Sequence, residues 1–214
     1  MGMGISERKE RQRAELREHI LRVAREMVVK EGFAALSMRK LADAVEYAPA
    51  TLYLHFENRE AIARELCIRG FEEFLARLEP AAVEPEPLAR LKVMAAAYVA
   101  FGLEHPETYR LIFMEDPKLS AELFQGTQDG AGPRSFGLLA SVFVDLQTAG
   151  RLAPEAQPAR LAEMLWAGLH GIVSLKLTCA AFKETTAEML RDTLLETLVH
   201  GLPGLKPARG ARAR

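Results

Sequence analysis

The sequence predicts an all-α protein with two domains: an N-terminal three-helix domain that contains a helix-turn-helix, and a C-terminal helical domain. Apolar residues recur at intervals of three and four along most of the 214 residues, which is the spacing of a helix face. No run alternates between apolar and polar residues between hairpin turns, so strands are not expected. Two short amphipathic segments joined by a tight turn lie near the N-terminus, and the remaining elements are interpreted around them.

Composition and charge are those of an ordinary globular chain. Lys and Arg number 28 against 29 Asp and Glu, and the formal net charge of -1 gives no overall basic field that would indicate nucleic acid. A basic face could still be offset elsewhere on the surface. Cys67 and Cys179 lie far apart and outside any paired-cysteine or metal spacing, which is typical of buried thiols in a reducing cytoplasm.

Targeting and membrane segments are not expected. Residues 1–10 contain no apolar core of a signal peptide. The longest apolar stretches, residues 93–103 and 165–175, are too short to span a bilayer. We therefore expect a cytoplasmic protein without a membrane partner, and no motif indicates a cofactor or a metal.

The first helix is expected to end at Glu31, where Gly32 can adopt the positive φ of a helix cap. Residues 6–13, which precede its apolar stripe, are charged, and we expect them to be frayed. Their basic side chains could form an arm that reaches nucleic-acid phosphates. The alternative is a solvated helix start, which the interleaved Glu7 and Glu10 favour.

The next two elements are short helices, residues 37–45 and 49–56. Ser37 can cap the first, because its hydroxyl can accept a backbone N–H at the helix start, and Pro49 suits the first turn of the second. A two-turn helix with a polar, aromatic outer face needs a scaffold and leaves that face to a partner. This is the layout of a helix-turn-helix, whose second helix enters the DNA major groove. The inward faces are apolar and consist of Leu41, Ala42, Val45, Leu52 and Phe56.

This region resembles the DNA-binding domain of TetR-type transcriptional regulators. The similarity covers roughly residues 14–66, and it departs from the family at the turn, where Glu46 stands in place of Gly and Ala48 in place of a capping Ser. Glu46 is therefore expected to have a positive φ. We interpret residues 1–57 as the helix-turn-helix DNA-binding domain. The residues that carry the resemblance are Leu36-Ser37-x-Arg39-x-Leu41-Ala42 and Thr51-Leu52-Tyr53-x-His55-Phe56-x-Asn58-Arg59-Glu60-Ala61-Ile62.

Candidate DNA-contacting side chains follow from this interpretation. The resemblance implies phosphate contacts for Tyr53, His55 and Arg59, which would fix the register without reading sequence. The alternatives are a packed surface tyrosine and a solvent-facing imidazole. Arg39 can pair with guanine O6 and N7 or, alternatively, with Asp43 one turn away. The start of the second helix is expected to read thymine methyl groups, with DNA shape supplying further specificity. The full DNA-binding set is Ser37, Arg39, Lys40, Tyr47, Pro49, Ala50, Thr51, Tyr53, His55 and Arg59.

A long helix is expected to follow, capped by Asn58 and ending near Leu78. Residues 79–87 contain three prolines and no helix period, so we expect a break there. Residues 58–83 are interpreted as a connecting helix and linker. In the family that the chain resembles, the corresponding helix links the two domains, so any signal between them would pass through it or its packing.

Residues 84–205 are interpreted as a second domain built from apolar helices. Residues 161–178 are apolar on most of their circumference, which indicates burial on more than one side. Residues 129–133 are expected to form a loop, and the basic tail, residues 206–214, is expected to be disordered. The expected helices are residues 88–105, 108–114, 118–124, 136–148, 161–178 and 186–200.

Two segments of this domain, Trp166-Ala-Gly-Leu-His170-Gly171 and Tyr109-Arg-Leu-Ile-Phe113, resemble the WHG type of TetR C-terminal domain. The resemblance implies an effector-binding and dimerisation domain. Flexible methionines and large aromatic residues suit an adaptable apolar cavity, with His170 as a polar anchor. The alternative is that these residues are core and that His170 bonds to a backbone carbonyl. The ligand-binding candidates are Met94, Tyr98, Phe101, Tyr109, Phe113, Met114, Phe143, Trp166 and His170, with Phe136 considered beside them.

The last two long helices, residues 161–178 and 186–200, are the expected interface of a homodimer, since two copies could form a four-helix bundle. The alternative is burial within one chain. Catalysis is not expected, because no HExxH, GxSxG, glycine-rich phosphate loop or paired-cysteine site occurs, and Pro106 separates Glu104 and His105 from Glu107.

These features predict a dimeric DNA-binding transcriptional regulator, a repressor that a small apolar molecule releases from an inverted-repeat operator in double-stranded DNA. Each protomer would place one helix-turn-helix in the major groove, with half-sites about one helical turn or a multiple apart. The alternatives are a DNA-binding dimer with no effector and, from another class, a helical enzyme or carrier.

Overall fold

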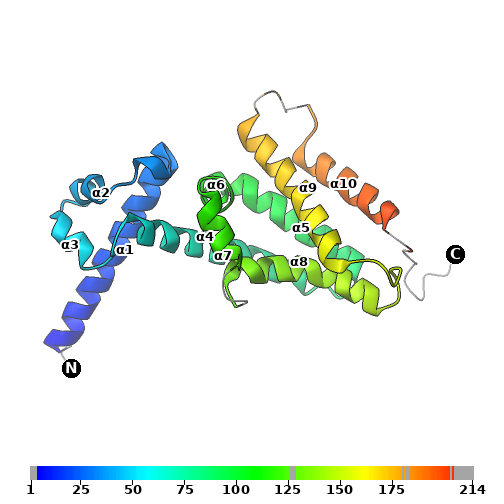
Figure 1. The fold of residues 1–214 in the computed structure, drawn as a ribbon, viewed down its shortest axis with the longest axis horizontal. Coiled ribbons are helices and arrows are strands. Elements are labelled where there is room, and N and C mark those ends of the chain that lie inside the picture. The colour runs from blue at the N-terminus through cyan, green and yellow to red at the C-terminus, as the bar shows by residue number, and fades with distance from the viewer. Residues whose placement is uncertain (1–3, 126–128, 180, 182–183, 203, 205–214) are drawn as a thin grey trace. The chain divides into compact units, whose positions relative to one another are not determined.

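The computed structural model describes residues 4–125, 129–179, 181, 184–202 and 204. Within these ranges the chain is helical and contains no strand, so the predicted all-α fold is confirmed (Figure 1). The expected tail, residues 206–214, lies outside the described residues. The elements in order are α1 (Ile5–Glu31), η1 (Phe33–Ala35), α2 (Met38–Ala44), α3 (Pro49–Tyr53), α4 (Arg59–Ala82), α5 (Pro87–Glu104), α6 (Pro106–Phe113), α7 (Pro117–Gln125), α8 (Ala131–Thr148), α9 (Pro158–Thr178) and α10 (Ala187–Gly201).

The chain forms two compact units. The first comprises the residues up to Gly70 together with Arg110–Glu122, and the second comprises Phe71–Tyr109 and the residues from Leu123 onward. Helices α4 and α6 therefore each contribute residues to both units. The expected domains divided the chain differently, because they placed residues 58–83 in a connecting helix and linker and Arg110–Glu122 in the second domain.

Local sequence signals position the helix-turn-helix of the first unit. The Ser37 hydroxyl accepts the Lys40 backbone N–H at 3.2 Å, and Pro49 is the first residue of α3, as predicted. Asn58 Oδ1 accepts the Ala61 N–H at 2.8 Å and so satisfies a free N–H at the start of α4. The inward residues Leu41, Ala42, Val45, Leu52 and Phe56 are all buried.

Charged side chains join α1 to the first turns of α4. Arg69 donates to both carboxylate oxygens of Glu18 at 2.6 Å and to Glu65 at 3.2 Å, and Glu65 also accepts from Arg17 at 3.2 Å. The Arg17 guanidinium carbon lies 4.5 Å from the centre of the Phe56 ring. Hydrogen bonds from Arg69 hold the pKa of Glu18 below its usual value. Single exposed ion pairs contribute about 0–1 kcal/mol each, but this connected set with planar guanidinium geometry holds the part of α4 in the first unit against α1.

Arg110–Glu122 belongs to the first unit through side chain to backbone contacts. Cys67 Sγ lies 3.6 Å from the carbonyl oxygen of Leu111, and the Ser120 hydroxyl donates to the carbonyl oxygen of Ile112 at 2.7 Å. Burial, followed by the nearby Asp116 carboxylate, raises the pKa of the Cys67 thiol to about 12. This thiol is therefore protonated at neutral pH and is not a nucleophile.

The second unit is a bundle in which α9 packs against α5, α8 and α10, while α5 also packs against α8 and α10 (Figure 1). Helices α5 and α9 approach closely at Gly102, because a Cβ atom there would lie 2.4 Å from Val173 Cγ1. The Phe74 ring of α4 adds an aromatic wall, with ring centres 5.3 Å from Tyr98 and 5.1 Å from Phe101.

Several helix boundaries expected from the sequence were wrong, and those of α4, α8 and α1 differ most from the structure. Helix α4 does not end near Leu78 but continues to Ala82, with Pro80 inside its last turn. Helix α8 begins at Ala131, inside the expected loop, and Pro133 lies in its first turn, where backbone N–H groups have no partner in the helix. Helix α1 begins at Ile5 rather than after a frayed segment, which agrees with the alternative of a solvated, mixed-charge helix start. No helix in the described ranges is long and apolar enough to cross a membrane.

Candidate DNA-binding surface and internal cavity

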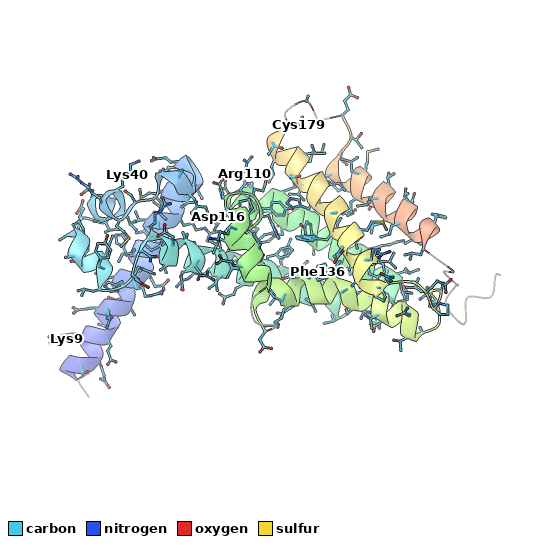
Figure 2. The ribbon with its side chains drawn as sticks, in the orientation of Figure 1. Lys9, Lys40, Arg110, Asp116, Phe136 and Cys179 are labelled. Carbon is cyan, nitrogen blue, oxygen red and sulfur yellow. The ribbon has the colours of Figure 1, made fainter. Side chains whose placement is uncertain are left out.

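The outer face of α2, the following turn and α3 is polar and solvent-exposed, while Leu52 beneath it is fully buried. Ser37 and Thr51 are half-buried at the start of α2 and within α3. Figure 2 labels Lys40 on this part of the first unit. The exposed members of the predicted DNA-binding set on this face are Arg39, Lys40, Tyr47, Pro49, Ala50 and Tyr53.

The turn between α2 and α3 is held by backbone hydrogen bonds. The Tyr47 N–H donates to the Ala42 carbonyl at 3.0 Å, and the Val45 N–H donates to the Leu41 carbonyl at 3.0 Å. Glu46 has φ 60, the left-handed conformation expected at this position. A non-glycine residue in this conformation costs about 1–2 kcal/mol. This turn leaves the Tyr47 ring 48% exposed beside the start of α3.

A groove of about 740 Å³ runs between the N-terminal half of α1 and the ends of α3. Two residues of the predicted DNA-binding set, Tyr47 and His55, line it. Arg13 Nη2 donates to the Leu54 carbonyl at 3.0 Å, and so ties α1 to the residue that follows α3. The lining residues are Gln12, Arg13, Glu15, Leu16, His19, Tyr47, Leu54 and His55.

His55 is half-buried in this groove. Its Nδ1 atom is inaccessible to solvent and has no hydrogen-bond partner within the described part of the chain. Burial, followed by the positive charges of Arg13 and Arg17, lowers the pKa of His55. The imidazole is therefore neutral at physiological pH and can still donate one ring N–H to an approaching phosphate.

Two basic residues of the predicted DNA-binding set already have partners in the free protein. Lys40 Nζ pairs with Glu31 at 3.4 Å, and Arg59 Nε pairs with Glu60 at 2.8 Å while its Nη1 donates to the Leu36 carbonyl at 3.4 Å. Both ion pairs are exposed, so each contributes little to stability. DNA phosphates could replace the carboxylates without a large loss.

The second unit contains an internal cavity of about 20 Å³, enough for a single water molecule. It lies among α4, α5, α8 and α9, and Figure 2 labels Phe136 on its α8 wall. The cavity is lined by Phe74, Leu78, Met94, Tyr98, Ser135, Phe136, Leu139 and Trp166.

A chain of hydrogen bonds runs from this cavity into the core. Trp166 Nε1 donates to Tyr98 Oη at 3.0 Å, the Tyr98 and Tyr109 hydroxyl oxygens lie 3.0 Å apart, and Tyr109 Oη lies 2.7 Å from His170 Nδ1. Burial lowers the pKa of His170 and raises the pKa of both tyrosines. All four groups are therefore neutral at physiological pH, and His170 Nδ1 can accept the Tyr109 hydroxyl proton.

The other predicted ligand-binding residues do not line the cavity. Phe101, Tyr109 and Phe143 are buried elsewhere in the second unit, and His170 reaches the cavity only through the hydrogen-bond chain. Phe113 and Met114 belong to the first unit and are half-buried there. The set of ligand-binding residues remains a prediction, and Met94, Tyr98, Trp166 and Phe136 are the members that meet at the cavity.

Comparison with known protein families decides the identity. A model described as bacterial regulatory proteins, tetR family, matches residues 20–66, and one described as tetracyclin repressor-like, C-terminal domain, matches residues 91–202, more than half of the chain. The chain belongs to the TetR family. It is therefore a DNA-binding transcriptional regulator.

The chain is also similar to two proteins described as HTH-type transcriptional regulators and to a solved structure of a protein of unknown function. The transcriptional regulator UidR of Escherichia coli K12 is 25% identical over 171 residues, which cover 74% of this chain and 80% of UidR. YobS of Bacillus subtilis is 27% identical over 96 residues, which cover 45% of this chain and half of YobS. A solved structure from Rhodococcus sp. RHA1 is 28% identical and superimposes with a TM-score of 0.72 over 87% of this chain and 95% of that chain.

Sequence reasoning missed two features of this TetR-family protein. The ion-pair network around Arg69 connects residues about fifty positions apart, which no local pattern reveals. The hydrogen-bond chain was missed although Trp166 and His170, four residues apart on one helix face, gave part of the signal. Tyr98 and Tyr109 lie on other helices, and only the fold brings them together. No group of three His, Cys, Asp or Glu side chains in the described ranges could hold a metal ion.

Mild acid is expected to destabilise the second unit through His170. Because burial lowers its pKa below the ordinary value of 6.5, the unfolded chain binds a proton near that pH that the folded protein excludes. The free energy of unfolding should be constant above this range and fall as the pH drops below about 6.5. Urea unfolding at about pH 5 and about pH 7.5, followed by the fluorescence of Trp166, measures the effect.

A His170→Asn variant is expected to flatten this pH dependence, because the amide oxygen can still accept the Tyr109 hydroxyl but does not titrate. Equal pH dependence in the wild type and His170→Asn would contradict the assignment to His170.

Proposed function

We propose that the protein is a homodimeric repressor that binds an inverted repeat in double-stranded DNA and is released by a small apolar effector bound in the second unit. The observation that carries the proposal is the exposed polar face over a fully buried Leu52, which leaves α3 free to enter a major groove. An exposed, uncharged stripe on α9 supports the dimer, and the hydrogen-bonding groups of Trp166 and Tyr98 at the cavity of the second unit support the effector.

In DNA recognition, some residues would position the protein on the phosphates and others would contact the bases. Tyr53, 55% exposed at the end of α3, and the neutral His55 are suited to donate to phosphates, which sets the register. Arg39 at the start of α2 can pair with guanine, and the methyl groups of Ala50 and Thr51 can contact thymine. Because α3 carries few groups that make two hydrogen bonds to one base, DNA shape is expected to contribute strongly to specificity.

The outer face of α9 has the properties of a helix interface. Met164, Ala167, Gly171 and Leu175 are spaced three or four residues apart, so they share one face, and Met164 and Leu175 are 52% and 42% exposed. No charge interrupts this stripe. A Cβ atom at Gly171 would meet nothing within 4 Å, so a partner helix could approach closely at this position.

Two hydroxyl groups beside this stripe are already satisfied by their own helix. Ser174 Oγ donates to the Gly171 carbonyl at 3.2 Å, and Thr178 Oγ1 donates to the Ser174 carbonyl at 2.6 Å. A partner could therefore cover them without leaving a buried donor unpaired. On α10, Met189, Thr193 and Thr197 form a second exposed and uncharged row at four-residue spacing. Two copies of α9 and α10 would form a four-helix bundle with the uncharged stripe of α9 at its centre.

The effector would act by differential binding. A ligand that favours a dimer with wrongly spaced helix-turn-helix motifs needs a coupling free energy of only about 1–3 kcal/mol to weaken DNA binding by up to about a hundredfold. By linkage, the operator should weaken effector binding by the same factor.

The size of the cavity favours a second candidate, a DNA-binding dimer with no small-molecule effector. A volume of about 20 Å³ is far below the roughly 150 Å³ of a cavity that binds benzene. The two candidates differ in one measurable respect: only the first requires that a filled cavity change the affinity for DNA.

Selection of bound duplexes from a random DNA pool at physiological salt tests the proposal. An inverted repeat is expected to be enriched, and Tyr53→Ala should bind it about tenfold more weakly with the same sequence preference, because a phosphate contact carries no base information. Tyr53→Phe removes the hydroxyl group but keeps the ring, so it shows which of the two makes the contact with DNA.

Arg39→Ala provides the contrast in this experiment, since it should relax the preference at one base pair of each half-site. No enriched sequence would contradict the proposal, and so would an unchanged preference in both Arg39→Ala and Thr51→Ala.

A further inference from the structure

Building on the proposed effector function, we propose that the cavity of the second unit takes an uncharged apolar alcohol or phenol, whose hydroxyl inserts into the hydrogen bond between Trp166 and Tyr98. Both side chains line the cavity, and their hydrogen bond joins α9 to α5 across it. Three features of the site carry the inference: its lack of charge, the direction of its hydrogen bonds and the way in which it can open.

Among the described residues, those that line the cavity include no carboxylate, amine, guanidinium or imidazole group. Its polar side chains are Tyr98, Ser135 and Trp166, and the Ser135 hydroxyl already donates to the Ala131 carbonyl at 2.7 Å. An ionised ligand would lose its hydration without gaining a partner of opposite charge, which costs several kcal/mol. Carboxylates and amines are therefore excluded as occupants.

The hydrogen bonds define what polar group fits. The indole N–H of Trp166 can only donate, so Tyr98 Oη is the acceptor in their hydrogen bond. In the arrangement in which both tyrosine hydroxyls donate along the chain, Tyr98 donates to Tyr109, and Tyr109 donates to His170 Nδ1. A ligand that enters between Trp166 and Tyr98 therefore meets one donor and one acceptor.

A hydroxyl group supplies the matching pair. Its oxygen would accept from Trp166 Nε1, and its proton would be donated to Tyr98 Oη, so the rest of the chain to His170 keeps its direction. A ketone could accept from Trp166 but would leave Tyr98 Oη without the donor it has now. A hydrocarbon could form no hydrogen bond with Trp166 or Tyr98, although its entry would still break the hydrogen bond between them.

The cavity must widen to hold the apolar part of such a molecule, and two side chains can make room. Phe136 is half-exposed, and its ring centre lies 6.1 Å from that of Trp166, so an outward rotation would open the α8 wall. Met94 is flexible enough to reshape the opposite side. Leu139 and Phe74 line the apolar part of the cavity that would keep its shape.

The single tryptophan of the chain, Trp166, makes the site directly observable. Titration of the full-length protein with 1-octanol, 2-octanone and octanoate, followed by tryptophan emission, is the test. Saturable binding of 1-octanol is expected, with 2-octanone several-fold weaker and octanoate at least about tenfold weaker. Tyr98→Phe should abolish the several-fold preference for 1-octanol over 2-octanone, because only the alcohol donates to Tyr98 Oη.

Phe136→Ala enlarges the site and should bind 1-octanol more tightly than the wild type does. This variant would reveal binding even if the wild-type cavity opened too rarely for binding to be detected. Binding of octanoate as tight as that of 1-octanol would overturn the proposal. So would the absence of any emission change in both the wild type and Phe136→Ala, or an undiminished preference for 1-octanol over 2-octanone in Tyr98→Phe.

Operator binding, measured in parallel on the selected duplex, separates this inference from the proposed function. If 1-octanol shifts the emission but leaves the operator affinity unchanged, the cavity site stands and the effector function fails. If 1-octanol releases the operator without saturable binding at Trp166, the effector acts elsewhere and the inference is overturned.

Discussion

Replacing Gly102 by alanine is expected to lower the free energy of unfolding of the second unit by about 2 kcal/mol. The added Cβ would lie 2.4 Å from Val173 Cγ1 and 3.1 Å from the Tyr109 ring. Val173 is fully buried and β-branched, so it has no alternative rotamer into which to move. This overpacking should outweigh the gain of about 1 kcal/mol that alanine gives over glycine inside a helix. Urea unfolding followed by Trp166 fluorescence measures the change.

Gly137→Ala is the matched control for this prediction. It makes the same substitution inside α8, where a Cβ atom would meet nothing within 4 Å, and should stabilise by up to about 1 kcal/mol. Adding Val173→Ala to Gly102→Ala should recover part of the loss. A Gly102→Ala variant as stable as Gly137→Ala would show that α5 and α9 do not approach as closely as described.

Replacing Gly171 by glutamate is expected to convert the proposed dimer to a monomer and to weaken operator binding at least about a hundredfold. In the monomer the new side chain extends into open space and glutamate favours a helix, so the fold itself should not suffer. In the dimer it would place an unpaired charge at the centre of the bundle. A monomer would bind the two half-sites independently and lose the high effective concentration of the second motif.

Light scattering at a fixed concentration, together with operator titration, checks both parts of this prediction. Val83→Glu is the control, since Val83 is 79% exposed between α4 and α5 and lies outside the uncharged stripe. It should remain dimeric with wild-type affinity. A Gly171→Glu protein that stays dimeric would move the interface away from α9.

Elements with a local cause could be predicted from the sequence. The Ser37 cap, Pro49 at the start of α3, the Asn58 contact and the positive φ of Glu46 all depend on residues within a few positions of each other. The helix-turn-helix followed from these signals and from the apolar spacing beneath it.

Elements that depend on tertiary packing could not be predicted. Pro80 would normally end a helix, but Leu75 and Leu78 of the same turns are buried and hold α4 in place to Ala82. The assignment of Arg110–Glu122 to the first unit rests on contacts such as that of Cys67 with Leu111, which are distant in sequence.

The candidate sites also combine features that the sequence predicts with features that depend on tertiary packing. Exposure of the α2–α3 face followed from helical spacing, because polar residues opposite a buried stripe must face outward. Aromatic residues on several apolar helices can be core or cavity wall with the same pattern. Tyr98 and Phe101 illustrate this, since both are buried on α5 but only Tyr98 borders the cavity.

The central claim is that two protomers of this regulator bind one inverted repeat. Sedimentation of the selected operator with excess protein tests it most directly, because it gives the mass of the complex. We expect two chains per duplex, with binding to an isolated half-site weaker by at least about a hundredfold. One chain per duplex, with equal affinity for the half-site and the full repeat, would contradict the account.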